Sequence, residues 1–408
     1  MRQDRNASVA FILVTILLDT LGVGVMLPVL PKLVSSFFGS DLAAASRYYG
    51  AFVAVYAAMQ FLFAPVMGGL SDRFGRRVVI LGSLLGAALN YVLLAVAPGL
   101  GWLYFGRIVA GITGASFSAA SAYIADITPP GQRAQGFGLV GAAFGLGFVV
   151  GPALGGLLGD VHLRLPFAVA AGLNLLNFAY GALVLPESLP PESRRPFSLR
   201  RANPLASLAR LGASPVVLGL TATLLCSHLA QQVLQGVWAL FTEERFGWRP
   251  FEIGGSLAVA GLGMAVVQGG LVRLVMPRLG ERRCLLLGLA VGAVSFAGFG
   301  LAGSGLAMIA LILPNALGGI AAPATQALIS REVDPSGQGA LQGSLASLAS
   351  LTAVAGPLLG ASLFARFSPA TAAPHVPGAP FFAAACINAA GLALALWLSA
   401  RRPAAAAR

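Results

Sequence analysis

Residues 9–30 read VAFILVTILLDTLGVGVMLPVL, an apolar run that one acidic residue, Asp19, interrupts. A helix needs about 20 residues to cross the roughly 30 Å hydrocarbon core of a bilayer. The run is long enough to do so. It is too long for the core of a signal peptide and lacks a small-residue cleavage site. Residues 9–30 therefore predict a membrane-spanning helix and not a cleaved leader.

The whole composition agrees with a membrane protein. Of 408 residues, 57% are hydrophobic and 10% are charged, and the mean hydropathy is +0.83. Soluble domains carry about 25% charged residues, so a water-soluble enzyme or a disordered chain is not expected. The sequence contains no nucleotide-binding P-loop, zinc-protease helix or nucleophile-elbow motif. We expect no catalytic activity, no metal and no cofactor, with any energy drawn from a gradient. The cysteines are far apart and predict free thiols: Cys226, Cys284 and Cys386.

Apolar runs of about 20 residues recur twelve times along the chain. Helices are favoured over a barrel because barrel strands would alternate over about 10 residues. The predicted spans are 9–31, 50–70, 78–98, 102–124, 135–159, 165–185, 214–240, 251–273, 284–303, 306–329, 339–364 and 380–399.

The distribution of basic residues predicts the orientation. Of the 26 Lys and Arg residues, nineteen lie in the two termini or in loops on the same side of the membrane as the termini. Six lie in loops on the opposite side, and Arg107 lies within a span. Because basic residues accumulate in cytoplasmic loops, both termini are expected in the cytoplasm, with the chain in the inner cell membrane. The net charge of +12 is then an orientation signal and not a nucleic-acid-binding surface.

The chain is duplicated. A Pro-, Ser- and Arg-rich linker, 186–213, separates a bundle at 1–185 from a bundle at 214–408, each with six spans. Motifs recur 205 residues later: Arg73, Gly75 and Arg77 as Arg278, Gly280 and Arg282, and Gly151-Pro152 as Gly356-Pro357. The predicted fold is an all-α membrane protein of two pseudo-symmetric six-helix bundles. Such bundles can alternate access to a central site; a duplicated scaffold without transport is the alternative.

Asp19 is the only acidic residue deep in a predicted span. A central Asp costs about 2.5–3.5 kcal/mol to insert, so a function is expected for it. We interpret it as the proton-coupling residue; a structural carboxyl paired with Arg107 is the alternative. Arg107, in the fourth span, could neutralise Asp19, tune it or contact substrate.

Further polar and small residues within the spans suggest a cavity and close helix contacts. His228, Gln231, Gln232 and Gln235 share one face of the seventh span, as their spacing requires; the alternative is interhelical hydrogen bonding. The predicted cavity-lining residues are these four with Gln60, Asn90, Gln268 and Asn315. Gly147, Gly151, Pro152 and Gly155 of the fifth span predict a close helix contact with a kink.

Residues 68–77, GGLSDRFGRR, resemble the signature loop of the major facilitator superfamily. That resemblance implies a cytoplasmic charge latch formed by Asp72, Arg73 and Arg77 beside Gly75, with Asp126 as partner. The repeat has Pro277 where Asp72 stands, so a second latch would be incomplete.

Other segments resemble the drug/proton antiporter branch, and tetracycline efflux proteins in particular. They include 18–31, Gly106-Arg107 with Gly111 to Ala115, Gly147 to Gly156, and 237–248 (VWALFTEERFGW). Three positions where those pumps carry an acid, a His and an acid hold Asn90, Met264 and Gly292.

The resemblance implies a proton-coupled antiporter that exports amphipathic drug-like compounds, with tetracycline among the candidates. The predicted partners are a small-molecule substrate, protons and the lipid bilayer, and the chain is expected to act as a monomer. The alternatives are a facilitator or importer of a small metabolite without proton coupling, and a non-transporting membrane receptor.

Overall fold

The computed structural model describes residues 2–39, 41–114, 116–129, 133–194, 214–333, 338–369 and 371–400. Within these residues all regular elements are helical, and twelve helical stretches are long and apolar enough to cross a membrane. The predicted all-α class and the predicted number of spans are confirmed.

Contacts divide the chain into two compact units. The first holds Met1–Gly39, Val55–Asn203 and Trp248–Ala258, and the second holds Ser40–Ala54, Pro204–Gly247 and Val259–Arg408. Helices α3 and α11 therefore each run from one unit into the other, which a division at the linker does not anticipate. The predicted bundles at 1–185 and 214–408 remain a prediction, and linker residues 195–213 lie outside the described part.

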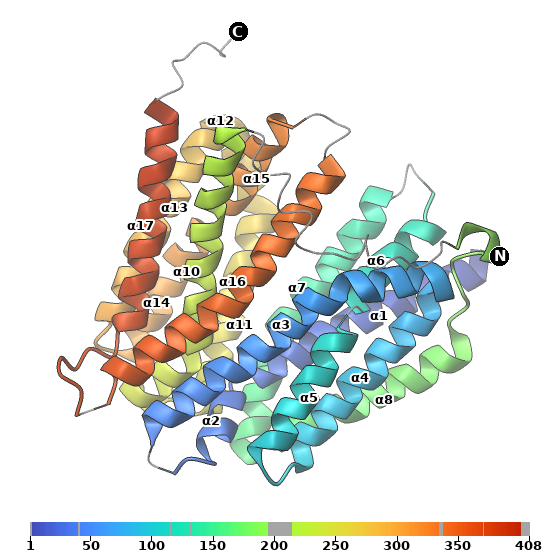
Figure 1. Cartoon of the computed structure of the whole chain (residues 1–408), viewed down its shortest axis with the longest axis horizontal. Helices are drawn as coiled ribbons and strands as arrows, with labels where there is room; N and C mark the ends of the chain where they lie inside the picture. Colours follow the sequence, from blue (N-terminus) through green and yellow to red (C-terminus); the bar gives the residue numbers. More distant parts are fainter. Residues whose placement is uncertain are drawn as a thin grey trace. The chain divides into compact units, whose positions relative to one another are not determined.

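The N-terminal half of the sequence forms six spans, of which the fourth is broken in two. Within the first unit, α4 and α8 lie side by side, and α1 packs against α7 and α8 (Figure 1). The helices are α1 (Arg2–Met26), α2 (Leu30–Ser35), α3 (Leu42–Phe74), α4 (Arg76–Val96), α5 (Leu100–Thr113), α6 (Ser116–Ile127), α7 (Arg133–Val161) and α8 (Leu165–Val184), followed by η2 (Pro191–Ser193).

The C-terminal half repeats this order. Within the second unit α13 and α17 lie side by side, as α4 and α8 do in the first (Figure 1). The elements are α10 (Pro215–Phe246), α11 (Pro250–Val266), the π-helical turn η4 (Val267–Leu271), α12 (Val272–Leu279), α13 (Glu281–Leu301), α14 (Gly305–Gly318), α15 (Ala321–Arg331), α16 (Gln338–Phe367) and α17 (Ala379–Ala400).

Helix boundaries recur at the spacing of the sequence repeat. Arg76 and Glu281 begin α4 and α13, 205 positions apart, and Val96 and Leu301 end them at the same spacing. The break in the fourth span recurs too, because α15 begins 205 positions after α6. The duplication is therefore one of structure as well as of sequence motifs.

Several helices extend beyond the predicted apolar runs to a capping residue. Helix α3 begins at Leu42 instead of residue 50, and the Asp41 side chain accepts a hydrogen bond from Ala44 N at 2.9 Å, as an N-cap does. Helix α10 continues past the predicted residue 240 to Phe246 and ends at Gly247, whose φ of +66° is readily available only to glycine. Hydropathy locates the buried part of a span and misses these polar ends.

The glycines of α7 allow it to lie directly on α1. A Cβ atom at Gly147 would lie 2.7 Å from Leu17 O, and one at Gly151 would lie 2.6 Å from Leu21 O and 2.9 Å from Gly24 Cα. Gly155 meets the backbone of Val25 in the same way. These obstacles are backbone atoms that no side-chain rotation removes. In contrast, Gly141 and Gly145 of the same helix face open space.

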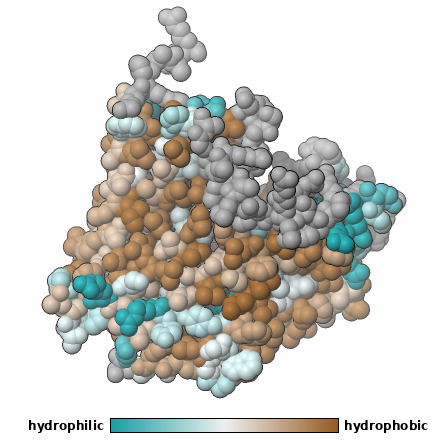
Figure 2. All heavy atoms as spheres, viewed as in Figure 1, coloured by the Kyte–Doolittle hydropathy of each residue, from teal (hydrophilic) through white to brown (hydrophobic). Residues whose placement is uncertain are grey.

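Large apolar side chains cover much of the visible face (Figure 2). Over all the described residues, the most exposed large apolar side chains include Leu183, Val161 and Leu306. Soluble monomers rarely expose apolar patches of such extent, so this surface suits contact with lipid.

The α1–α7 contact generates the first prediction. Gly151→Ala should destabilise the protein by about 1–3 kcal/mol because the new Cβ overlaps backbone atoms of α1. Thermal unfolding in detergent measures the change. Gly145→Ala is the control, which should be neutral or stabilising because it only gains helix propensity. Equal melting temperatures for the two variants would contradict the packing.

Candidate functional site

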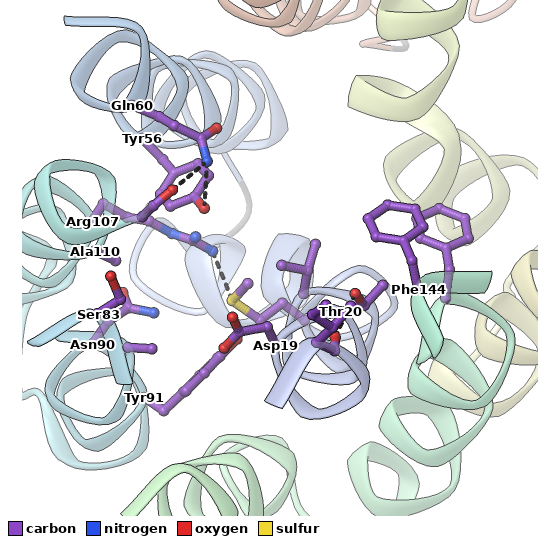
Figure 3. Close-up of a pocket in the computed structure, with 16 residues that line it drawn as sticks. Asp19, Thr20, Tyr56, Gln60, Ser83, Asn90, Tyr91, Arg107, Ala110 and Phe144 are labelled. Carbon is purple, nitrogen blue, oxygen red and sulfur yellow. Dashed lines mark hydrogen bonds between the residues drawn. The ribbon is translucent and has the colours of Figure 1, made fainter. Parts of the chain in front are cut away.

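A pocket of about 210 Å³ lies inside the first unit, bounded by α1, α3, α4, α5 and α7. Its lining is polar on one side and aromatic on the other (Figure 3). Asp19 and Arg107 are the only charged side chains among the residues that line it. The structure therefore brings together the two charged residues that the sequence predicted to act jointly.

Arg107 is buried at membrane depth, with 5% of its surface exposed. Its Nη2 donates to the Met26 sulfur at 2.8 Å, and its Cζ lies 5.2 Å from the centre of the Tyr56 ring. A thioether and an aromatic face are weak partners for a guanidinium that remains charged. The Asp19 carboxyl, across the same small pocket, is the group able to balance that charge when it is ionised.

Tyr91 of α4 extends toward Asp19 (Figure 3). Its hydroxyl occupies the space that a Cβ at Gly22 would need. Gly22 lies three residues after Asp19, on the same face of α1. Glycine at this position thus permits the Tyr91 hydroxyl to reach the helix surface beside the carboxyl.

The break between α5 and α6 supplies a further polar group. Helix α5 ends at Thr113, and the carbonyl of Gly114 accepts a hydrogen bond from Gln60 Nε2 at 3.1 Å. Gln60 Nε2 also lies 3.5 Å from the Tyr56 hydroxyl. The predicted continuous span at 102–124 is therefore broken inside the pocket, where a non-helical backbone carbonyl finds a side-chain partner.

Two buried oxygens of α4 remain available for a ligand or water. Ser83 Oγ and Asn90 Oδ1 have no hydrogen-bond partner among the described residues. Both residues line the pocket, and Asn90 is 2% exposed. Because buried polar groups are nearly always satisfied, these oxygens indicate that the pocket receives polar atoms.

Aromatic side chains form the other side of the pocket. The rings of Phe144 and Phe148 on α7 are stacked with centres 6.4 Å apart and planes inclined by 9°. Figure 3 shows Phe144 across α1 from Arg107. An amphipathic aromatic molecule would find both a flat apolar wall and polar groups here.

The other predicted cavity residues do not line this pocket. His228, Gln231, Gln232 and Gln235 lie on α10 in the second unit, where Gln232 packs against Gly356 of α16. Gln268 lies in the π-helical turn η4, a deformation common at functional sites, and Asn315 lies on α14. Their assignment as cavity residues remains a prediction.

Tyr56, Tyr91, Phe144 and Met26 were missed by the sequence analysis. Tyr, Phe and Met are ordinary components of a hydrophobic core, so their presence in a span gives no signal. The four-residue spacing of Phe144 and Phe148 gives only a weak one.

A second polar site, the charge network, is formed around the signature loop by Asp72, Arg76, Asp126 and Glu187. Arg76 Nη1 lies 2.6 Å from Asp72 Oδ1, and Arg76 Nε lies 3.3 Å from Asp126 Oδ2. The predicted latch residues Asp72 and Asp126 thus meet through Arg76. Arg73 is exposed with its Cζ 5.1 Å from the Phe74 ring, and Arg77 Nη2 donates to Ala182 O at 2.6 Å.

Glu187, which was not predicted, closes the network. One of its carboxylate oxygens accepts hydrogen bonds from Arg76 N at 2.8 Å and from Ser188 N and Leu189 N at 3.0 Å; the other accepts from Arg77 N at 3.2 Å. Glu187 therefore caps the N-terminus of α4, where a negative charge is favourable. Gly75 is required for two reasons. Its φ of +106° is unfavourable for other residues, and a Cβ added at this position would overlap the Glu187 carboxylate.

Within the described residues no group of His, Cys, Asp or Glu side chains is arranged to hold a metal ion. Cys226, Cys284 and Cys386 are free thiols.

The chain is similar in sequence and in fold to proteins of one family. The model of the Major Facilitator Superfamily matches residues 12–302. The chain is 45% identical over 360 residues to the class C tetracycline resistance protein of Escherichia coli, covering 88% of this chain and 90% of that one. It is 40% identical to the class G tetracycline resistance protein of Vibrio anguillarum, covering 86% and 89%. A bacterial homologue of the human lysosomal transporter Spinster, 17% identical, shares the fold with a TM-score of 0.78 over 98% of both chains.

The carboxylate cap of α4 generates the second prediction. Glu187→Ala should lower stability by about 1–2 kcal/mol because four backbone N–H groups, two of them at the start of α4, lose their charged acceptor. Thermal unfolding measures the effect, with the exposed Glu192→Ala as control for loss of one negative charge in the same segment. If the Glu187→Ala and Glu192→Ala proteins have the same melting temperature, the Glu187 cap does not contribute to stability.

Proposed function

Because the chain belongs to the major facilitator superfamily, we propose that it exports amphipathic aromatic drugs from the cell in exchange for protons. Tetracycline is the first compound to test, since two relatives that the chain covers almost completely are tetracycline resistance proteins. The proposed setting is the inner membrane, as a monomer with both termini in the cytoplasm and with the proton gradient in place of any cofactor.

Asp19 carries the proposal. With Asp19 ionised, its charge and that of Arg107 sum to zero; with Asp19 protonated, the pocket holds one positive charge. A single proton thus changes the field inside a small, largely apolar pocket, where charges interact strongly. A protein with two conformations responds to such a change by a shift in their populations. Proton binding at Asp19 can in this way drive the exchange.

We infer that one carboxyl is enough for coupling. At two positions where tetracycline pumps carry an acid, this chain has a neutral residue. One is Asn90, which lines the pocket, and the other is Gly292 on α13. The space beside Gly292 is taken by the Asn388 amide, which donates to Leu289 O at 3.0 Å. An acidic side chain at 292 would have to displace that amide. We propose one proton per transport cycle, with Asp19 as its carrier.

The size of the pocket limits what it can bind. Sites for drug-sized ligands are usually about 300–1,000 Å³, and this pocket has about 210 Å³. It suits the proton site and one end of a larger substrate, such as an aromatic ring against Phe144. The small volume also favours the second candidate, a facilitator of a small metabolite without proton coupling.

The third prediction tests coupling. Asp19→Asn should reduce uptake of tetracycline into inside-out vesicles under an imposed pH gradient to the level of empty vesicles, because the amide cannot carry a proton. Asp19→Glu should retain part of the activity, and His228→Gln tests the histidine of the seventh span. Asp19→Asn retaining full gradient-driven uptake would eliminate Asp19 as the coupling residue, and wild-type flux that ignores the gradient would favour the facilitator.

The fourth prediction concerns the aromatic wall. Phe144→Ala and Phe148→Ala should each raise the KM for planar aromatic drugs about two- to tenfold, the equivalent of one lost aromatic contact. A growth screen of expressing cells against a drug panel, followed by transport kinetics, measures this. Leu146→Ala, an exposed position on the same helix, is the control. Unchanged KM values in both Phe variants would place the substrate elsewhere.

A further inference from the structure

The sequence repeat relates the Arg76–Asp126 ion pair to a pair of opposite polarity. Adding 205 to these numbers gives Glu281 and Arg331. In the second unit Arg331 Nη2 lies 2.7 Å from Glu281 Oε1. The basic and acidic partners have therefore exchanged places between the two repeats. The loss of Asp72 to Pro277 suggested an incomplete second latch, yet an ion pair is present.

The surroundings of the two pairs match closely. Gly75 and Gly280 both have positive φ, +106° and +77°, and α4 and α13 begin at the next residue. Asp126 lies in the last turn of α6, and Arg331 is the last residue of α15. The next arginine also repeats, because Arg77 donates to Ala182 O near the end of α8 and Arg282 donates to Ser399 O near the end of α17. The two ion pairs thus occupy equivalent places.

The helix dipoles distinguish the two polarities. Glu281 lies at the N-terminus of α13 and Arg331 at the C-terminus of α15, where negative and positive charges respectively are favourable. Arg76 and Asp126 have the unfavourable order. In the first unit Glu187 offsets this by placing its carboxylate on the first N–H groups of α4. The repeat position of Glu187 is Leu392, which cannot do so. Each unit therefore has a negative charge at this helix N-terminus, supplied by a different residue.

We propose that Glu281 and Arg331 are a positioning pair for transport, equivalent to Arg76 and Asp126 with the polarity exchanged. The ion pair itself is given by the geometry. Its role in transport rests on the proposed function. The pair holds the end of α15, which follows the break after α14, against the start of α13. Since Arg331 is 72% exposed, the pair contributes little to overall stability. Its effect is expected on the rate of transport and not on substrate affinity.

Glu281 should be the more sensitive partner. It is the only acidic residue in the surface groove that it forms with Arg273, Arg331 and four neighbouring residues. Its removal leaves Arg273 and Arg331 as the only charged side chains of the groove, whereas removal of Arg331 leaves Glu281 beside Arg273. The Arg273 position corresponds to Gly68 in the first repeat, so this additional charge is specific to the second unit.

The test is a charge-reversal series in the full-length protein in vesicles, with the amount of protein in the membrane measured. Glu281→Gln should lower Vmax about two- to fivefold with KM unchanged, and Arg331→Gln should lower it less. The double variant Glu281→Arg with Arg331→Glu should recover part of the Vmax, and Arg283→Gln, on the same exposed helix end, should match the wild type. In contrast, Arg76→Glu with Asp126→Arg should not recover, because the new carboxylate at position 76 would meet both Asp72 and Glu187 at the start of α4.

A double-mutant cycle of melting temperatures for Glu281 and Arg331 separates this inference from the transport function. Because Arg331 is largely exposed, the expected coupling is small, about 1–2 °C, and stabilising in sign. A wild type that transports none of the drugs would refute the proposed function, and the cycle would then decide the pair by itself. A charge-reversed double variant no better than the single variants in either measurement would overturn the pairing. Full Vmax in Glu281→Gln would overturn its role in transport.

Discussion

The buried guanidinium of Arg107 is the constraint on which the first unit depends. A permanent positive charge at membrane depth requires compensation, and the pocket provides one carboxyl, one thioether and one aromatic face from α1 and α3. The pocket-facing sides of α1 and α3 supply these groups around Arg107 of α5. The need for compensation makes the protonation of Asp19 consequential, because the carboxyl is the one partner whose charge can change.

Close backbone contact makes such a small pocket possible. Gly147, Gly151 and Gly155 bring α7 onto α1, and Gly22 admits the Tyr91 hydroxyl to the surface of α1 beside Asp19. In lipid, helices gain little from burying apolar side chains against one another, so packing of small residues has greater weight. The glycine content of the chain therefore serves geometry at specific places, while Gly141 and Gly145 face open space on the same helix.

The two repeats preserve geometry more strictly than they preserve residues. Helix boundaries and the positive-φ glycines recur at one spacing, yet the ion pair beside them exchanges its polarity. An ion pair depends on the product of its charges, so either order joins the same two helix ends. Only the helix dipole distinguishes the two orders of charge. The first repeat has no acidic residue at the first position of α4, and Glu187 supplies the negative charge there instead.

Hydropathy and the repeat were sufficient to predict twelve helical spans in two similar halves, because a bilayer imposes length and polarity on each span independently. The cost of a buried charge likewise identified Asp19 and Arg107 from the sequence. The tertiary structure alone decided that Tyr56, Met26 and Phe144 share their pocket, that Arg76 and not Arg73 joins Asp72 to Asp126, and that Glu187 caps α4. Apolar and aromatic residues look alike in any span, and contacts between residues 50 or more positions apart depend on how helices rotate and pack against one another.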